Sequence, residues 1–343
     1  MHPVILSLAS RSLVVRSLAG LCLFAAACAS VPPPPAGAQD QAIDIRNSSL
    51  PLKIDEPDAT TVGRLIWRGG IAMTANTPHF GSWSDLHVAA DGRSLTSISD
   101  EGAWLTATID YDSRGHLAGL SAGRLGQLRG LDGKPIAAKA DADAEAMARL
   151  PDGSWLVAFE RRHRLWRYPT LTDTPAPVEG PAEIGRQPAN GGIEALAALA
   201  DGRVIAISEE YGQRPNTAMG WIGEPTAGGG YLWRSFDYAT IPDFRPTAIT
   251  MLPDGSFATI ERAFDMVRGV RCRVMRFDAA QLKPGATVRA EELARLAAPY
   301  AVDNLEGMAA TKGARGETLL WLISDDNFNR LQRNILLLFE LAL

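Results

Sequence analysis

The sequence predicts an all-β protein built from repeated sheets, a β-propeller, and three observations support this prediction. Asp-Gly pairs begin at residues 91, 152, 201 and 254, with spacings of 61, 49 and 53 residues, and similar text surrounds each pair. A period of about 50 residues is typical of four-stranded propeller blades. Apolar residues alternate or form short blocks between turns, and only 290–297 has a helical pattern.

Each repeat is expected to be an antiparallel hairpin with further strands outside it. A copy consists of a short apolar strand, a turn and a second β-rich strand that ends in an acid. A fifth copy, with a longer turn, follows at 305–327. Additional strands are expected at 163–168, 230–238 and 272–278, so that each unit has three or four strands.

The two chain ends are expected to share a blade. Short apolar segments at 65–67 and 71–73 precede the first copy, and another at 335–341 ends the chain. Together they would form a sixth blade, which closes the ring and removes exposed strand edges. We therefore expect six blades, although the spacing is also compatible with five or seven.

Charge and composition exclude one class of partner. The 343 residues carry a formal charge of -5, which becomes -7 when Arg11 and Arg16 are removed with the first 27 residues. An acidic surface repels phosphate backbones, and no run of Lys and Arg interleaved with aromatic residues occurs. We expect no nucleic-acid partner.

The N-terminus predicts export. Residues 1–27 combine a basic start with an apolar stretch too short to span a bilayer, as in a signal peptide. The string FAAAC resembles a bacterial lipobox that would place a lipid on Cys28, and ordinary signal-peptidase cleavage is the alternative. The proline-rich residues 28–42 predict a tether, and the folded domain is expected over 43–343. We expect a periplasmic monomer that contacts the membrane only through this anchor.

Acids recur at both ends of the expected hairpins. Those before the first strand are Asp85, Glu145, Glu194 and Glu306, with Thr247 in the fourth copy, and those after the second strand are Asp100, Glu160, Glu209, Glu261 and Asp325. If the blades are related by rotation about one axis, these carboxylates converge on one face. Converging carboxylates repel unless a cation compensates, and a set of oxygen ligands suits Ca²⁺.

The alternative is a structural role for each acid. A carboxylate at a strand end can stabilise a turn or form an ion pair with a nearby arginine on the rim. Arg161 and Arg262 directly follow two of the acids, and Arg162 follows Arg161. The acids would then brace the blades without binding a ligand.

Other motifs carry less weight. The string GLSAG matches the GxSxG nucleophile elbow, but it lacks the strand before and the helix after, so Ser121 is interpreted as a loop residue. The acids of 141–152 resemble an EF-hand loop without its required glycine. His163 is interpreted as a surface strand residue and Cys272 as a small buried one. The polar run 324–333 predicts a turn held by Asn and Asp side chains, or a functional segment.

Five pairs of strings carry a family resemblance. They are FGSWSDL with SDEG, DAEAMARLPDG with FE, NGGIEALAALADG with SEE, RPTAITMLPDG with ERAF, and DNLEGMA with SDDNFNRLQRNILLLF. On these strings the chain resembles the bacterial phytase-like family, often labelled "esterase-like activity of phytase", over roughly 60–341. It departs from the family pattern at Glu101, where Arg is common, and at Thr247, which lacks a carboxylate. Arg161, Arg262 and Arg330 are candidates to replace the missing cation.

The resemblance implies hydrolysis of phosphoric esters in a region formed by the repeated acids. For this sequence we assign catalytic roles to Glu145, Glu160, Glu194, Glu209, Arg161 and Arg262. We assign Ca²⁺ or another divalent cation to Asp85, Asp100, Glu194, Glu306, Asp325 and Asp326, with Asn327 nearby.

The resulting hypothesis is an exported, phytase-like hydrolase of small phosphate esters that depends on a divalent cation. In this hypothesis the two arginines clamp phosphate oxygens. A non-catalytic propeller of the cell envelope that binds a ligand or protein is one alternative. A Ca²⁺-dependent lactonase or carboxylesterase is another, because one fold supports many activities.

Overall fold

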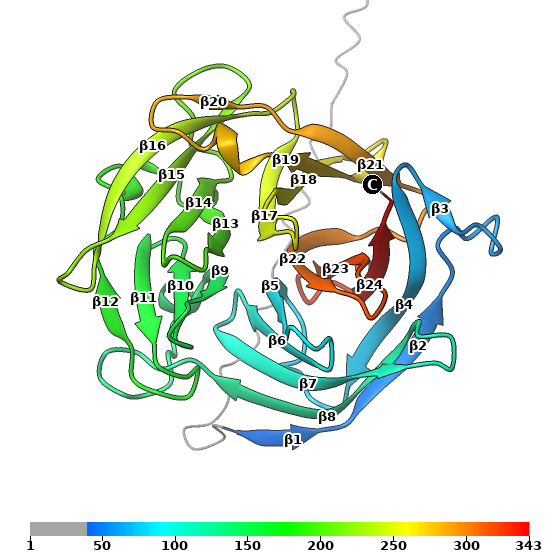
Figure 1. Ribbon diagram of the computed structural model, residues 1–343. Coiled ribbons are helices and arrows are strands. Elements are labelled where there is room, and N and C mark those ends of the chain that lie inside the picture. The colour runs from blue at the N-terminus through cyan, green and yellow to red at the C-terminus, as the bar shows by residue number, and fades with distance from the viewer. Residues whose placement is uncertain (1–39, 343) are drawn as a thin grey trace, which may run out of the picture.

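The computed structural model describes residues 40–342 and shows five β-sheets arranged as blades around a central axis (Figure 1). The expected signal peptide over 1–27, Cys28 and nearly all of the tether lie outside the described residues. Within those residues, no helix has the length and apolar character needed to cross a membrane.

The strands of the five blades follow in spatial order. Blade 1 contains β1 (Gln41–Ile43), β8 (Leu117–Gln127), β7 (Ala103–Tyr111), β6 (Ser94–Ser99) and β5 (Trp83–Val88). Blade 2 contains β12 (Ala176–Val178), β11 (Arg164–Tyr168), β10 (Trp155–Phe159) and β9 (Ala144–Arg149), with the short helix α1 (Lys139–Ala142) before β9. Blade 3 contains β13 (Ile193–Ala198), β14 (Val204–Ser208), β15 (Thr217–Pro225), β16 (Tyr231–Ala239) and β20 (Thr287–Val288).

The remaining two blades complete the ring. Blade 4 contains β17 (Arg245–Met251), β18 (Phe257–Asp265), β19 (Gly269–Phe277) and β21 (Glu291–Ala297). Blade 5 contains β22 (Asn304–Lys312), β23 (Thr318–Asp325), β24 (Asn334–Leu341), β4 (Leu65–Ala75) and β2 (Ile45–Leu50), with β3 (Thr61–Val62) also paired to β4. Two 3₁₀ turns lie in connections between strands. The turn η1 (Ile184–Arg186) lies between β12 of blade 2 and β13 of blade 3, and η2 (Ala279–Gln281) lies between β19 of blade 4 and β20 of blade 3.

The chain ends share a blade, as expected, but the expectation of six blades is wrong. In blade 5, β24 pairs with β23 on one side and with β4 on the other, so the last strand joins the first part of the domain to the fifth repeat (Figure 1). The segments expected to form a sixth blade are therefore the outer half of blade 5. The inner strands contact one another in the cyclic order β5, β9, β13, β17, β22, which closes the ring with five.

The inner hairpins form as the repeats predict. The glycine of each Asp-Gly turn, at 92, 153, 202 and 255, has φ between 70° and 85°, a left-handed conformation that glycine adopts without steric cost. Strands expected at 163–168, 230–238 and 272–278 are present as β11, β16 and β19. The helical interpretation of 290–297 is wrong, because this segment is β21 and pairs along β19.

Five apolar clusters hold the blades together, one at each junction between neighbouring blades. The second strands β10 and β14 are buried on both faces, since each contributes side chains to the clusters on both sides of its blade. Trp83 and Trp321 are fully buried in the junction between blades 5 and 1, and Trp221 is fully buried in the junction between blades 2 and 3. Rigid packing at every junction fixes the inner strand ends relative to one another.

Candidate functional site

A β-bulge marks the start of every inner hairpin. In each ladder the first strand contains one residue without a partner, and these residues are Ser84, Glu145, Glu194, Thr247 and Glu306. On the second strand, the residue before each bulge pairs with Ser99, Phe159, Ser208, Glu261 or Ser324, and the residue that follows this partner is Asp100, Glu160, Glu209, Arg262 or Asp325. A bulge re-aims the side chain that it carries. All ten positions lie at one end of the ring, and we call the seven acids among them the acidic face.

Contacts between blades show that these acids converge. The Nη2 atom of Arg262 lies 3.2 Å from Glu209 of blade 3 and 3.1 Å from Glu306 of blade 5. The side-chain amide of Asn304 donates hydrogen bonds to Glu306 at 2.8 Å and to Asp325 at 3.2 Å. Contacts through Arg262 and Asn304 therefore connect acids that were expected to converge around the axis.

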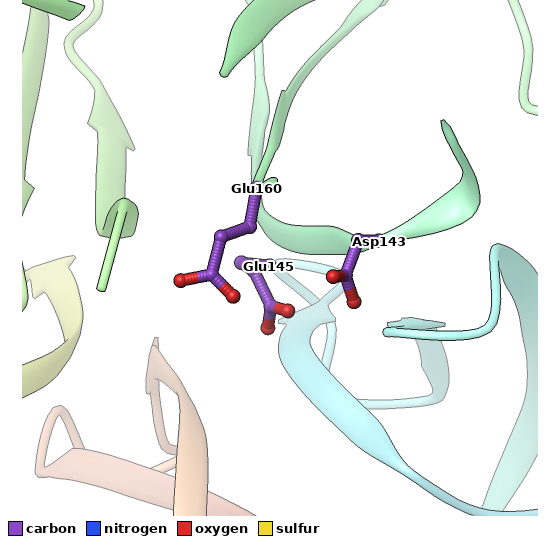
Figure 2. A group of neighbouring side chains, drawn as sticks. All are labelled: Asp143, Glu145 and Glu160. Atoms are coloured by element: carbon purple, nitrogen blue, oxygen red, sulfur yellow. The ribbon is translucent and has the colours of Figure 1, made fainter. Parts of the chain in front are cut away.

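Blade 2 adds an acid that the sequence analysis did not assign. One oxygen from each of Asp143, Glu145 and Glu160 lies within 4.8 Å of the other two, and Figure 2 shows the three carboxylates side by side. Lys139 of α1 joins this cluster to blade 1, since its Nζ lies 2.7 Å from Asp143 and 2.8 Å from Asp100. Asp143 directly precedes β9 and has no counterpart in the other repeats, so repetition alone could not identify it.

Burial raises the pKa values of several acids of the acidic face. Together with nearby carboxylates, it raises the pKa of Glu160 to about 7, that of Glu306 to about 8 and that of Asp325 to about 7. The pKa values of Glu145 and Glu194 are well above the ordinary range for the same two reasons. Without further positive charge, part of the acidic face carries protons at neutral pH.

Several carboxylate oxygens at the acidic face have no hydrogen-bond donor among the described residues. Glu145 accepts no hydrogen bond, and Glu160 accepts from the N–H groups of Gly191 and Gly192 through Oε1 alone. The Oε2 atom of Glu194 is buried and has no partner. The acidic face and Asp143 together present eight carboxylates against the cations Lys139, Arg161 and Arg262. Such oxygens in this charge environment fit a hard divalent cation.

Asp85 lies one residue away from the bulge position that Ser84 occupies. It is buried, and its two carboxylate oxygens accept hydrogen bonds of 2.7 Å from the N–H groups of Leu86 and Met147. The structure thus places this predicted cation ligand in a backbone network between blades 1 and 2. We leave it out of the candidate metal site.

Glu261 lies one residue before the corresponding position of β18, which Arg262 occupies. Glu261 is fully buried and contacts Arg273 at 2.6 Å and the hydroxyl of Tyr238 at 3.0 Å. Asp326 lies beside the face but accepts hydrogen bonds from the N–H of Ser82 and the amide of Asn334, both at 2.9 Å. These contacts stabilise the turn expected within 324–333.

The predicted cationic residues differ in accessibility. The Arg161 side chain is 43% exposed and pairs with Asp143, and its backbone has a φ of 54°. The Arg262 side chain is 21% exposed and is already occupied by acidic partners. A phosphate oxygen would therefore reach Arg161 more easily than Arg262.

The remaining candidates have structural explanations. His163 contacts the carbonyl oxygen of Pro188 at 2.8 Å. Ser121 lies in β8, not in a loop, and donates to Asp110 at 3.0 Å, so no nucleophile elbow is present there. Cys272 is a free, buried thiol, as expected.

Comparisons with solved structures found propellers and enzymes of low similarity. The β-propeller domain of Cps50 (Swd1) from Myceliophteria thermophila has 9% identity and a TM-score of 0.40, with 87% of this chain and 99% of that chain covered. Virginiamycin B lyase from Staphylococcus aureus has 12% identity, a TM-score of 0.39 and coverages of 86% and 99%. A putative gluconolactonase has 9% identity, a TM-score of 0.36 and coverages of 85% and 98%. No curated protein matches the chain.

A family model provides the assignment. The model described as "Esterase-like activity of phytase" matches residues 78–328, a segment that contains the inner hairpins of all five blades and every acid of the acidic face. The resemblance seen in the repeated strings is thereby confirmed. The chain belongs to the phytase-like family.

Proposed function

We propose that this protein is a divalent-cation-dependent hydrolase of small phosphate esters and that the acidic face is its active site. The observation that carries the proposal is the cluster of Asp143, Glu145 and Glu160, which offers three carboxylate oxygens within 4.8 Å of one another. Membership of the phytase-like family supports phosphate esters as the substrate class. Ca²⁺ is the first candidate ion because all the ligands are oxygens.

The residues of the acidic face have distinct roles in this proposal. The cluster holds the cation, which when bound would offset phosphate charge and lower the pKa of a water molecule. Arg161, the most exposed of the three cations, orients phosphate oxygens by charge-assisted hydrogen bonds. Glu194 has a buried oxygen without a partner and a raised pKa, so it is suited to hold a proton and donate it to the leaving alcohol.

Turnover assays with purified protein test the proposal. We expect hydrolysis of p-nitrophenyl phosphate, bis-p-nitrophenyl phosphate or inositol hexakisphosphate that is lost with a chelator and restored by Ca²⁺. The Glu145→Gln variant should lose this activity, whereas Glu224→Gln, an exposed change on β15, should retain it. Turnover that persists in chelator would contradict the cation role.

The same assay separates the alternative functions. Hydrolysis of p-nitrophenyl acetate or a lactone, without phosphate release, would identify an esterase or lactonase. A bound ion without any turnover would support a non-catalytic propeller. This alternative is favoured by Lys139, Arg161 and Arg262, whose side chains already offset part of the negative charge of the acids.

We also propose that the protein acts outside the inner membrane, attached through a lipid on Cys28. The basis is the leader sequence and the lipobox-like string. Labelling with radioactive palmitate should mark the wild-type protein and not Cys28→Ser. Equal labelling of both would exclude this anchor.

A further inference from the structure

The fourth blade departs from the pattern of the other four. At the bulge position and its counterpart on the second strand it has Thr247 and Arg262. Blades 2, 3 and 5 have two acids each at these positions, and blade 1 has one. The hydroxyl of Thr247 donates to the carbonyl oxygen of Leu305, so this side chain serves the junction with blade 5. Arg262 therefore places a positive charge at a position that carries an acid elsewhere in the ring.

The contacts of Arg262 are those of a bridging cation. Its Nη2 atom lies 3.2 Å from Glu209 and 3.1 Å from Glu306, which belong to the blades on either side. Its Nη1 atom donates to the side-chain oxygen of Asn304 at 2.7 Å. The guanidinium thus joins three blades through oxygen atoms that a metal ion could also bind.

An independent feature points to a ligand at the same place. Glu194 is more than nine-tenths buried, and its Oε2 atom has no hydrogen-bond partner within residues 40–342. Burial raises the pKa of this carboxylate most, and the nearby charges of Glu209 and Glu306 raise it further while that of Arg262 lowers it. A buried carboxylate oxygen left without a donor is costly unless a cation or water satisfies it.

We infer that Glu194, Glu209 and Glu306 form a second cation site whose resident cation is the guanidinium of Arg262. The acidic face accordingly binds one divalent ion, at Asp143, Glu145 and Glu160, and Arg262 prevents a second from binding. The inference rests on the proposed cation binding by the acidic face. It assigns Arg262 a positioning role that limits the number of ions, in place of direct contact with phosphate.

Binding stoichiometry tests this inference independently of activity. Calorimetric titration with Ca²⁺, repeated with Mn²⁺, should give one ion per chain for the wild-type protein and two for Arg262→Gln. The Arg262→Lys variant keeps the charge and should bind one ion. Arg203→Gln, which removes a surface arginine paired with Asp201 at a turn, is the matched control and should also bind one.

Each outcome decides the question. One ion for both the wild-type protein and Arg262→Gln would overturn the inference and leave the proposed metal cluster intact. No bound ion in the wild-type protein and one in Arg262→Gln would support the inference. The same result would contradict the proposed metal site at Asp143, Glu145 and Glu160. An Arg262→Gln protein that folds only with millimolar Ca²⁺ would support it, because the ion then replaces the guanidinium. Failure to fold at every cation concentration would overturn it.

Discussion

The carboxylate of Asp85 accepts a 2.7 Å hydrogen bond from the backbone N–H of Met147, which belongs to the next blade. A second oxygen of the same carboxylate accepts a hydrogen bond from the N–H of Leu86, also at 2.7 Å. One buried side chain therefore links the inner strands of blades 1 and 2. This relationship gives Asp85 a structural role at the junction between these two blades.

We predict that Asp85→Ala destabilises the protein by about 2–4 kcal/mol, because buried N–H groups lose their acceptor. Asp85→Asn, which keeps one oxygen, should have an intermediate effect. Chemical unfolding measures the loss, and calorimetry should show unchanged Ca²⁺ stoichiometry. A stable variant that no longer binds the ion would instead make Asp85 a ligand.

The Glu145→Gln substitution should weaken Ca²⁺ binding at least ~10-fold, because it removes one of the three charged ligands of the cluster. The fold should be preserved, since Glu145 accepts no hydrogen bond from the described residues. Titration calorimetry measures the affinity, with Glu224→Gln as the control. Equal affinity in all three proteins would place the ion elsewhere.

The stability of the metal-free protein should fall as pH rises from about 4.5 to about 8. Glu160, Glu306 and Asp325 have pKa values of about 7, 8 and 7 when folded, well above those of an unfolded chain. The folded state therefore holds more protons in this window, and ionisation costs more in it than in the unfolded state. In chelator, we expect an unfolding temperature about 5 °C or more lower at pH 8.5 than at pH 5.5.

Ca²⁺ should remove most of this pH dependence, because a bound cation favours the ionised carboxylates. The same melting curves with millimolar Ca²⁺ provide the comparison. Stability that is constant or rises over this window in chelator would show that the acidic face is not held in a partly protonated state.

The Cys272 thiol should react slowly in the folded protein. Burial raises its pKa to about 12, and its sulfur contacts only the interior, including the carbonyl oxygen of Asp303 at 3.7 Å. Since the thiolate is the reactive form, alkylation at pH 8 should be at least ~100-fold slower than in denaturant. Mass spectrometry of the peptide that contains Cys272 measures both rates, and similar rates would contradict its burial.

Much of the fold could be predicted from the sequence because Asp-Gly turns recur and each has a glycine that the turn requires. The number of blades could not. Whether terminal strands form a new sheet or complete an existing one depends on the pairing of β24 with β4 and β23, which no local pattern records. The conformation of 290–297 could not be predicted either. The residues of this segment have helix propensity, but hydrogen bonding to the edge of β19 stabilises a strand there.

The acids were predicted in the right places except at two hairpins. Glu160 and Glu209 lie seven residues after the turn glycine, whereas Glu261 lies six after Gly255, so counting from the turn would have selected Arg262. Counting backwards from the turn gives the same kind of result. Glu145 lies eight residues before its turn glycine, and the residue at that distance in the first hairpin is Ser84, not Asp85. Aligning the repeats by sequence similarity matches residues of the same type. A bulge shifts the register by one residue, and this shift determines which side chain points toward the axis.

The shared blade has a consequence for how the protein is made. Because β24 lies between β4 and β23, the N-terminal strands lack their neighbour until residues 334–341 leave the ribosome. A nascent chain with an open ring stays suited to threading through a translocation pore. For a protein that we propose is exported, closure of the ring thus waits for the eight residues of β24, which pair with both β23 and β4.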